Sequence, residues 1–131
     1  MLNKISMRTV TVGAMLLAVT FLSACGKKVT VGTNDEVRYE GSATKQEAEA
    51  LGAALKTSGY FQDKGVSVIL SKGSDGTVIS YVVKDGFWDD PTHVQGFADL
   101  TRALASTVGG LPIKVRLVNQ AVETKKEVPV S

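Results

Sequence analysis

Two β-branched runs joined by a short turn lie at the centre of the chain and constrain its fold most strongly. The runs are "VSVILS" (66–71) and "TVISYVV" (77–83), and "KGSDG" stands between them. Val and Ile favour strands, and Asp75-Gly76 supplies the positive φ values that a tight hairpin needs. The centre of the chain is therefore predicted to form a β-hairpin.

An amphipathic helix is predicted on each side of this hairpin. The first follows the capping box "TKQE" (44–47) and places apolar residues at helical spacing: Ala48, Leu51, Gly52 and Leu55. The second begins near Asp90 and stops at Gly109-Gly110. Its apolar stripe comprises Val94, Phe97, Ala98, Thr101, Leu104, Ala105 and Val108.

Two outer segments alternate between apolar and charged residues, as strands with one buried face do. In "DEVRYEG" (35–41) Val37 and Tyr39 alternate with acids and Arg38, and in "PIKVRLVN" (112–119) the apolar residues alternate with Lys114 and Arg116. The resulting order βαββαβ predicts an α+β fold, the ferredoxin-like two-layer sandwich. In it, two helices cover one face of a four-stranded antiparallel sheet.

The other face of that sheet is expected to be open. Both sides of the two central strands carry apolar groups, so the sequence does not decide which of their faces is buried. The residues expected on the open face are Arg38, Glu36 or Glu40, Ser67, Ile69, Ser71, Ser80, Lys114 and Arg116. A partly apolar open face indicates a binding partner, either another protein or a second copy of the chain.

The N-terminus has the three-part pattern of an export signal. Lys4 and Arg8 precede Val10 to Leu22, an uncharged run that is too short for a transmembrane helix, which takes about 20 residues. The next residues, Leu22-Ser23-Ala24-Cys25, resemble the lipobox of bacterial lipoproteins. That resemblance implies removal of residues 1–24, diacylglycerol on the Cys25 sulfur and acylation of the new amino group.

Membrane attachment through these acyl chains is what the resemblance implies for localisation. Two or three acyl chains anchor a protein stably, whereas one does so only marginally. Gly26 stands where an Asp would signal retention in the inner membrane. The resemblance therefore implies the cell envelope, and the periplasmic side of the outer membrane if the cell is Gram-negative.

The remainder of the chain is predicted to comprise a lipidated Cys and polar tether (25–34), one α+β domain (35–119) and a flexible tail (120–131).

Net charge argues against a nucleic-acid partner. The chain has 15 Lys and Arg against 13 Asp and Glu, and the surplus of two is accounted for by Lys4 and Arg8. After removal of the signal the domain is electrically balanced, so it has no global field that would attract a polyanion.

The stretch "KDGFWDDPTH" (84–93) is the strongest candidate for a ligand site. It contains the only Trp and the only His of the chain, and its candidate ligand-binding residues are Asp85, Trp88, Asp89, Asp90 and His93. A structural interpretation competes, because Asp90-Pro91 is a favoured helix start. Zn²⁺ sites usually need three or four ligands, and the spacing does not match a Ca²⁺ loop. We therefore favour the helix cap and predict no metal site.

No catalytic constellation is recognisable. The chain lacks a G-x-S-x-G motif, a Cys–His pair outside the lipidated Cys and a phosphate-binding loop. We therefore expect a non-enzymatic envelope lipoprotein without a cofactor, which binds a partner through its open sheet face. The alternative is a module that binds a small ligand or cation at residues 85–93.

Overall fold

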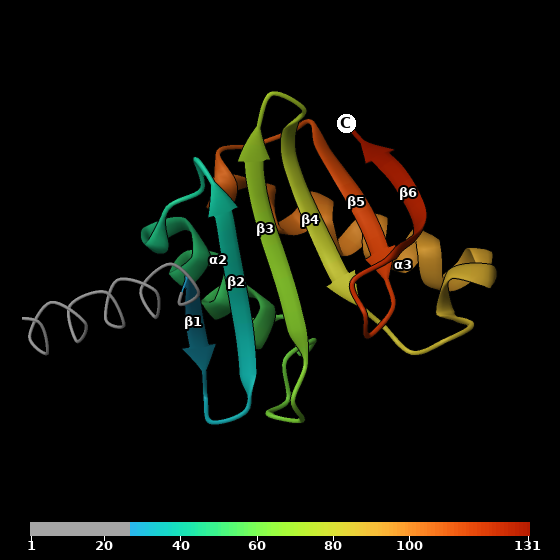
Figure 1. Ribbon diagram of the computed structural model, residues 1–131, viewed down its shortest axis with the longest axis horizontal. Coiled ribbons are helices and arrows are strands. Elements are labelled where there is room, and N and C mark those ends of the chain that lie inside the picture. Colours follow the sequence, from blue (N-terminus) through green and yellow to red (C-terminus); the bar gives the residue numbers. More distant parts are fainter. Residues whose placement is uncertain (1–26) are drawn as a thin grey trace, which may run out of the picture.

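A computed structural model describes residues 27–131 and shows one mixed sheet with helices on one of its faces (Figure 1). The predicted signal segment (1–24) and Cys25 lie outside the described residues. The sheet has six strands in sequence order: β1 (Lys28–Val31), β2 (Asp35–Gly41), β3 (Ser67–Gly73), β4 (Gly76–Val82), β5 (Ile113–Val118) and β6 (Thr124–Val130). The helices are α2 (Lys45–Thr57) and α3 (Pro91–Leu104), with short 3₁₀ turns at Phe87–Asp89 and Ala105–Val108.

The predicted ferredoxin-like sandwich is wrong, although the α+β class holds. The sheet is mixed: β2 pairs with β3 in parallel, as β4 does with β5, and the other three pairs are antiparallel. A split βαβ arrangement would leave a strand between the two strands that a helix connects. Here each helix connects neighbouring strands, so the four expected strands lie in simple sequence order.

Two edge strands were missed because they fall in segments that we predicted to be a tether and a tail. Within the predicted tether 25–34, β1 pairs with β2, and within the predicted tail 120–131, β6 pairs with β5. Val130 at the end of β6 is almost completely buried. The folded domain therefore extends on both sides of the predicted 35–119.

Both helix starts follow the predicted capping chemistry. The Thr44 hydroxyl accepts a hydrogen bond from the Glu47 amide at 3.1 Å, and the Glu47 carboxylate accepts one from the Thr44 amide at 3.0 Å. At α3 the Asp90 carboxylate accepts from the Thr92 amide at 2.8 Å, and Pro91 takes the first helical position. These bonds satisfy amides that would otherwise lack a partner at a helix N-terminus.

The two helical crossovers have opposite hands. β2 and β3 run antiparallel to β4 and β5, but in both connections the chain moves to the next strand in the same direction across the sheet. In Figure 1 both helices lie behind the sheet. The β2–α2–β3 connection is therefore left-handed, against a strong general preference for right-handed crossovers. α2 packs over β1 and β2, and a Cβ at Gly52 would come within 2.6 Å of Val31, so glycine permits this close approach.

The core lies between the helices and the covered face of the sheet. Its largest fully buried side chains include Leu51 and Leu55 of α2, Leu70 and Tyr81 of the central strands, and Leu117 of β5. The Tyr81 and Phe97 rings have centroids 4.8 Å apart, and the Tyr81 hydroxyl bonds the buried Thr101 hydroxyl at 2.8 Å. In residues 27–131 no helix is long and apolar enough to span a membrane.

Candidate functional site: the open face of the sheet

The face of the sheet opposite the helices displays the residues that the alternation predicted. Strand pairing and burial place Glu36, Arg38 and Glu40 of β2 on it, together with Ser67, Ile69 and Ser71 of β3, Ser80 of β4, and Lys114 and Arg116 of β5. Val78, Val82 and Val118 share this face by the same register. The open face therefore carries small, mostly apolar side chains along its centre and charged side chains along its sides.

One charged side, or wall, is formed by β1 and β2. Glu36 accepts a hydrogen bond from the Arg38 guanidinium at 2.5 Å, and the Lys28 ammonium lies 3.7 Å from the same carboxylate. Partial burial acts to raise the pKa of Glu36, but the bond and charge of Arg38 and the charge of Lys28 outweigh it and lower the pKa. This wall is thus internally paired at neutral pH.

The other wall is formed by β5 and β6. Glu127 accepts a hydrogen bond from Arg116 at 2.8 Å and lies 3.8 Å from the Lys114 ammonium. The bond from Arg116 lowers the pKa of Glu127. Because β6 was predicted to be a tail, Glu127 was missed. The period-two placement of Lys126, Val128 and Val130 was the available signal for this strand.

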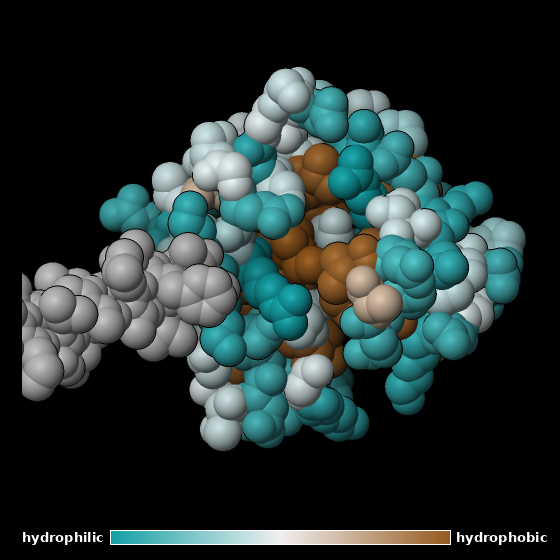
Figure 2. Space-filling model, in the orientation of Figure 1, coloured by the Kyte–Doolittle hydropathy of each residue, from teal (hydrophilic) through white to brown (hydrophobic). Residues whose placement is uncertain are grey.

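The floor between the walls is recessed, and we call it the trough; it comprises Ile69, Val78, Ser80, Val82 and Val118. Although they face away from the helices, Ile69 and Val78 are only 7% and 4% exposed. Figure 2 shows this apolar band crossing the middle of the face between hydrophilic flanks. The short side chains lie on β3 and β4 and the long ones on β2 and β5, so the difference in side-chain length creates the depression.

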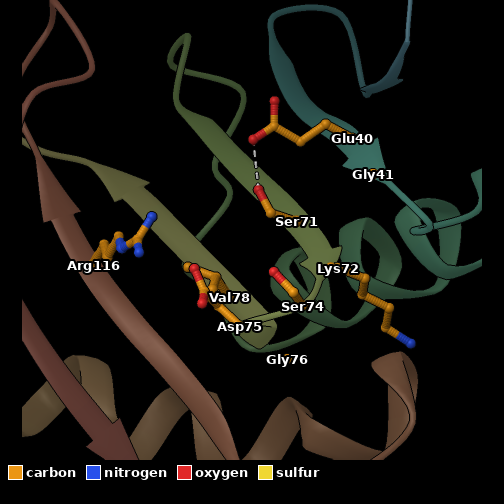
Figure 3. A pocket seen from close by; sticks show the side chains of 10 residues that line it. Glu40, Gly41, Ser71, Lys72, Ser74, Asp75, Gly76, Val78 and Arg116 are labelled. Carbon is orange, nitrogen blue, oxygen red and sulfur yellow. Dashed lines mark hydrogen bonds between the residues drawn. The ribbon is translucent and has the colours of Figure 1, made fainter.

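A pocket of about 350 Å³ lies at the end of the trough nearest the β3–β4 turn (Figure 3). Glu40 and Ser71 form one side, where the Ser71 hydroxyl donates to the carboxylate at 2.7 Å. Arg116 and Asp75 contribute opposite charges across it. At Gly41 a Cβ would lie 2.0 Å from the Lys72 carbonyl oxygen, and φ is +66°, so only glycine fits here. The pocket offers donors and acceptors in balance, which suits polar recognition.

The 85–93 segment does not gather its candidate residues around one point. Asp90 caps α3, and its second carboxylate oxygen lies 3.6 Å from His93 Nδ1. The His93 ring also stacks on Phe87 at 4.5 Å. Asp85 is exposed in the preceding turn, whereas Trp88 and Asp89 line a separate pocket. Within the described part of the chain no three His, Cys, Asp or Glu residues could jointly hold a metal ion.

Comparisons with known proteins give no relative from which a function could be inferred. No protein-family model, curated protein or solved structure matches this chain.

Proposed function

We propose that this chain is a non-enzymatic lipoprotein of the cell envelope, which binds another protein, or a second copy of itself, through the open face of its sheet. The observation that carries the proposal is the trough: an apolar floor between two charged walls. A sheet face built for water alone would carry polar side chains on its central strands as well.

The dimensions of the trough favour one extended segment of a protein as its occupant. Its floor lies mainly on β3 and β4, which are neighbouring strands about 5 Å apart, and Val118 of β5 extends it at one end. Such a segment would bury its apolar side chains against Ile69 and Val78 while its polar groups reach the walls. Each wall contains both acids and bases, so we expect a partner of mixed charge rather than a polyanion.

Lipid attachment at Cys25 is the second part of the proposal. The sequence Leu22-Ser23-Ala24-Cys25 and the apolar run before it support the attachment. Lys27 already belongs to the folded domain, because its carbonyl oxygen accepts a hydrogen bond from the Tyr39 amide at 3.1 Å. Only Gly26 would then separate the acylated residue from the sheet, so the β1 edge would lie close to the bilayer surface.

In-cell photocrosslinking tests the trough. A photoreactive residue at Ser71 or Arg116 should yield a discrete crosslinked product, either with another envelope protein or with a second copy. The same residue at Ala53, exposed on α2, serves as the control. The proposal is lost if the trough positions give no product, or if the Ala53 position gives the same one.

A Cys25→Ser variant tests the anchor separately. We expect it to remain unprocessed at the bond before residue 25 and to lack acyl chains by mass spectrometry. If the variant is cut at the same bond and stays in the membrane fraction, the lipoprotein assignment is wrong.

A further inference from the structure

A second pocket, of about 280 Å³, lies between the start of α3 and the strand β6. We call it the Trp88 pocket; it is lined by Trp88, Asp89, Pro91, Val94, Gln95 and Lys126. It is a different site from the trough, which lies on the other face. The lining also differs from the candidate ligand-binding residues that the sequence predicted. It includes Lys126 of β6, and it lacks Asp85, Asp90 and His93.

The apolar part of the Trp88 pocket is a flat ring flanked by aliphatic groups. Trp88 is only partly buried although it packs against the core. Trp88 also lines the pocket, so part of its indole is accessible to a ligand there, and aromatic rings supply large contact areas at small cost in conformational entropy. Pro91 and Val94 extend this apolar surface.

The polar part of the Trp88 pocket has no net charge. Asp89 contributes a carboxylate and Lys126 an ammonium group, while Gln95 contributes an amide that already donates to Asp99 at 2.9 Å. Among residues 27–131, Asp89 and Lys126 form neither an ion pair nor a side-chain hydrogen bond, whereas neighbouring Asp90 is engaged at the helix cap. Two charges of opposite sign with free hydrogen-bonding capacity favour a neutral ligand that both donates and accepts.

We propose that the Trp88 pocket binds one neutral pyranose ring of an oligosaccharide. A pyranose has a face of C–H groups that can lie on the indole, and hydroxyl groups around its edge that can reach Asp89, Gln95 and Lys126. A free anion would meet the Asp89 carboxylate, and a cation would meet Lys126. The volume is at the lower end for ligand pockets, about 300 Å³, which fits a single ring rather than a long apolar ligand.

Fluorescence titration of the full mature protein tests this proposal, because Trp88 is the only tryptophan of the chain. The probes are the tetramer of N-acetylglucosamine and maltotetraose, each raised to millimolar concentration. We expect a saturable change in emission with at least one of them. A trace without saturation for both probes would overturn the proposal.

Variants assign the binding to the pocket. Asp89→Asn leaves an exposed position uncharged and should weaken binding about tenfold, as expected for loss of a charge-assisted hydrogen bond. Phe87→Ala is the matched control, because this neighbouring ring is also exposed but stacks on His93 outside the pocket. If calorimetry shows that Trp88→Ala binds the probe as well as the parent protein does, the pocket is not the site. Crosslinking from the trough would be unaffected by these changes, so the two proposals fail independently.

Discussion

The buried carboxylate of Asp35 connects two loops at one end of the sheet. It is 1% exposed and accepts hydrogen bonds from the amides of Asp63, Gly65 and Val66 at 2.7, 3.0 and 2.8 Å. Asp35→Ala would leave these amides without their acceptor. We expect a loss of about 2–4 kcal/mol in the free energy of unfolding, measured with urea. Asp85→Ala, at an exposed turn position, should change it by less than about 0.5 kcal/mol.

Val122 is held in a backbone conformation that β-branched residues rarely adopt. Its φ is +62° in the β5–β6 turn, and its side chain is 43% exposed. A left-handed conformation costs an L-residue about 1–2 kcal/mol, and glycine avoids most of that cost. Val122→Gly should therefore raise the free energy of unfolding by about 1 kcal/mol. Gln120 lies in the same turn but has no positive φ, so Gln120→Gly should not raise the free energy of unfolding. If both changes stabilise the protein equally, the backbone of Val122 is not strained.

At the scale of elements, β6 decides whether the C-terminal segment belongs to the domain. Val130 pairs with Ile113 and is buried in the core. Val130→Ala should cost about 1–3 kcal/mol of unfolding free energy, because a buried methyl pair is removed and a cavity remains. Pro129→Ala on the exposed face of the same strand should have little effect. If both variants unfold at the same urea concentration as the parent protein, the strand does not contribute to the core.

The elements that the sequence predicted well are those with a complete local signal. The Thr44–Glu47 capping box and the Asp90 cap occur as expected, because neighbouring residues determine them. The hairpin also forms, but its two turn residues are Ser74 and Asp75, and of the pair Asp75-Gly76 only the glycine has a positive φ. On the two outer segments, now β2 and β5, strict alternation also specified which side is buried. On β3 and β4, where both sides carry apolar groups, the sequence left the faces undecided, and the structure places Ser67, Ile69, Ser71 and Ser80 on the open one.

What could not be predicted depends on contacts between distant segments. β1 has four residues and β6 contains Pro129 and adjacent lysines, so neither has a strong strand pattern alone. Both are formed by pairing with a neighbour that supplies the apolar surface. Strand order also depends on distant contacts: β2 pairs in parallel with β3, and α2 packs on β1 where Gly52 meets Val31, and no local pattern encodes either contact. Consequently the Glu127 wall and the Lys126 side of the Trp88 pocket were missed.

For the molecule as a whole, carboxylates that are paired with cations contribute to the loss of stability at acid pH. Hydrogen bonds and nearby cations lower the pKa values of Glu36, Glu47 and Glu127 below 4.5. Their contribution is complete above pH 4.5, where the unfolded chain is also ionised, and is lost as the pH falls through the lower values of the folded state. We expect the urea midpoint to be level from pH 7 to about 5 and to fall below 4.5. The triple Gln variant of these residues should show a smaller acid decline.

At alkaline pH the buried Tyr81 and the half-buried Tyr60 contribute to the loss of stability. Burial raises the pKa of Tyr81 to about 12, and it raises that of Tyr60 as well. Between pH 10 and 12 the unfolded chain loses the Tyr81 proton while the folded protein retains it, so stability falls as the pH rises. From pH 10 to 11 this one group should cost about 1 kcal/mol, given 1.36 kcal/mol for each unit of pKa difference. Tyr81→Phe should therefore lose about 1 kcal/mol less than the parent protein over that interval.

Thr101→Val provides the control that separates titration from packing. It removes the same 2.8 Å hydrogen bond between the sheet and α3 but leaves the tyrosine in place. Both variants should be less stable than the parent protein at pH 8, by about 1 kcal/mol. Only Tyr81→Phe should show the shallower alkaline decline in urea unfolding. If Thr101→Val shows the same shallow decline, the effect comes from the lost bond, and the buried Tyr81 proton does not govern alkaline stability.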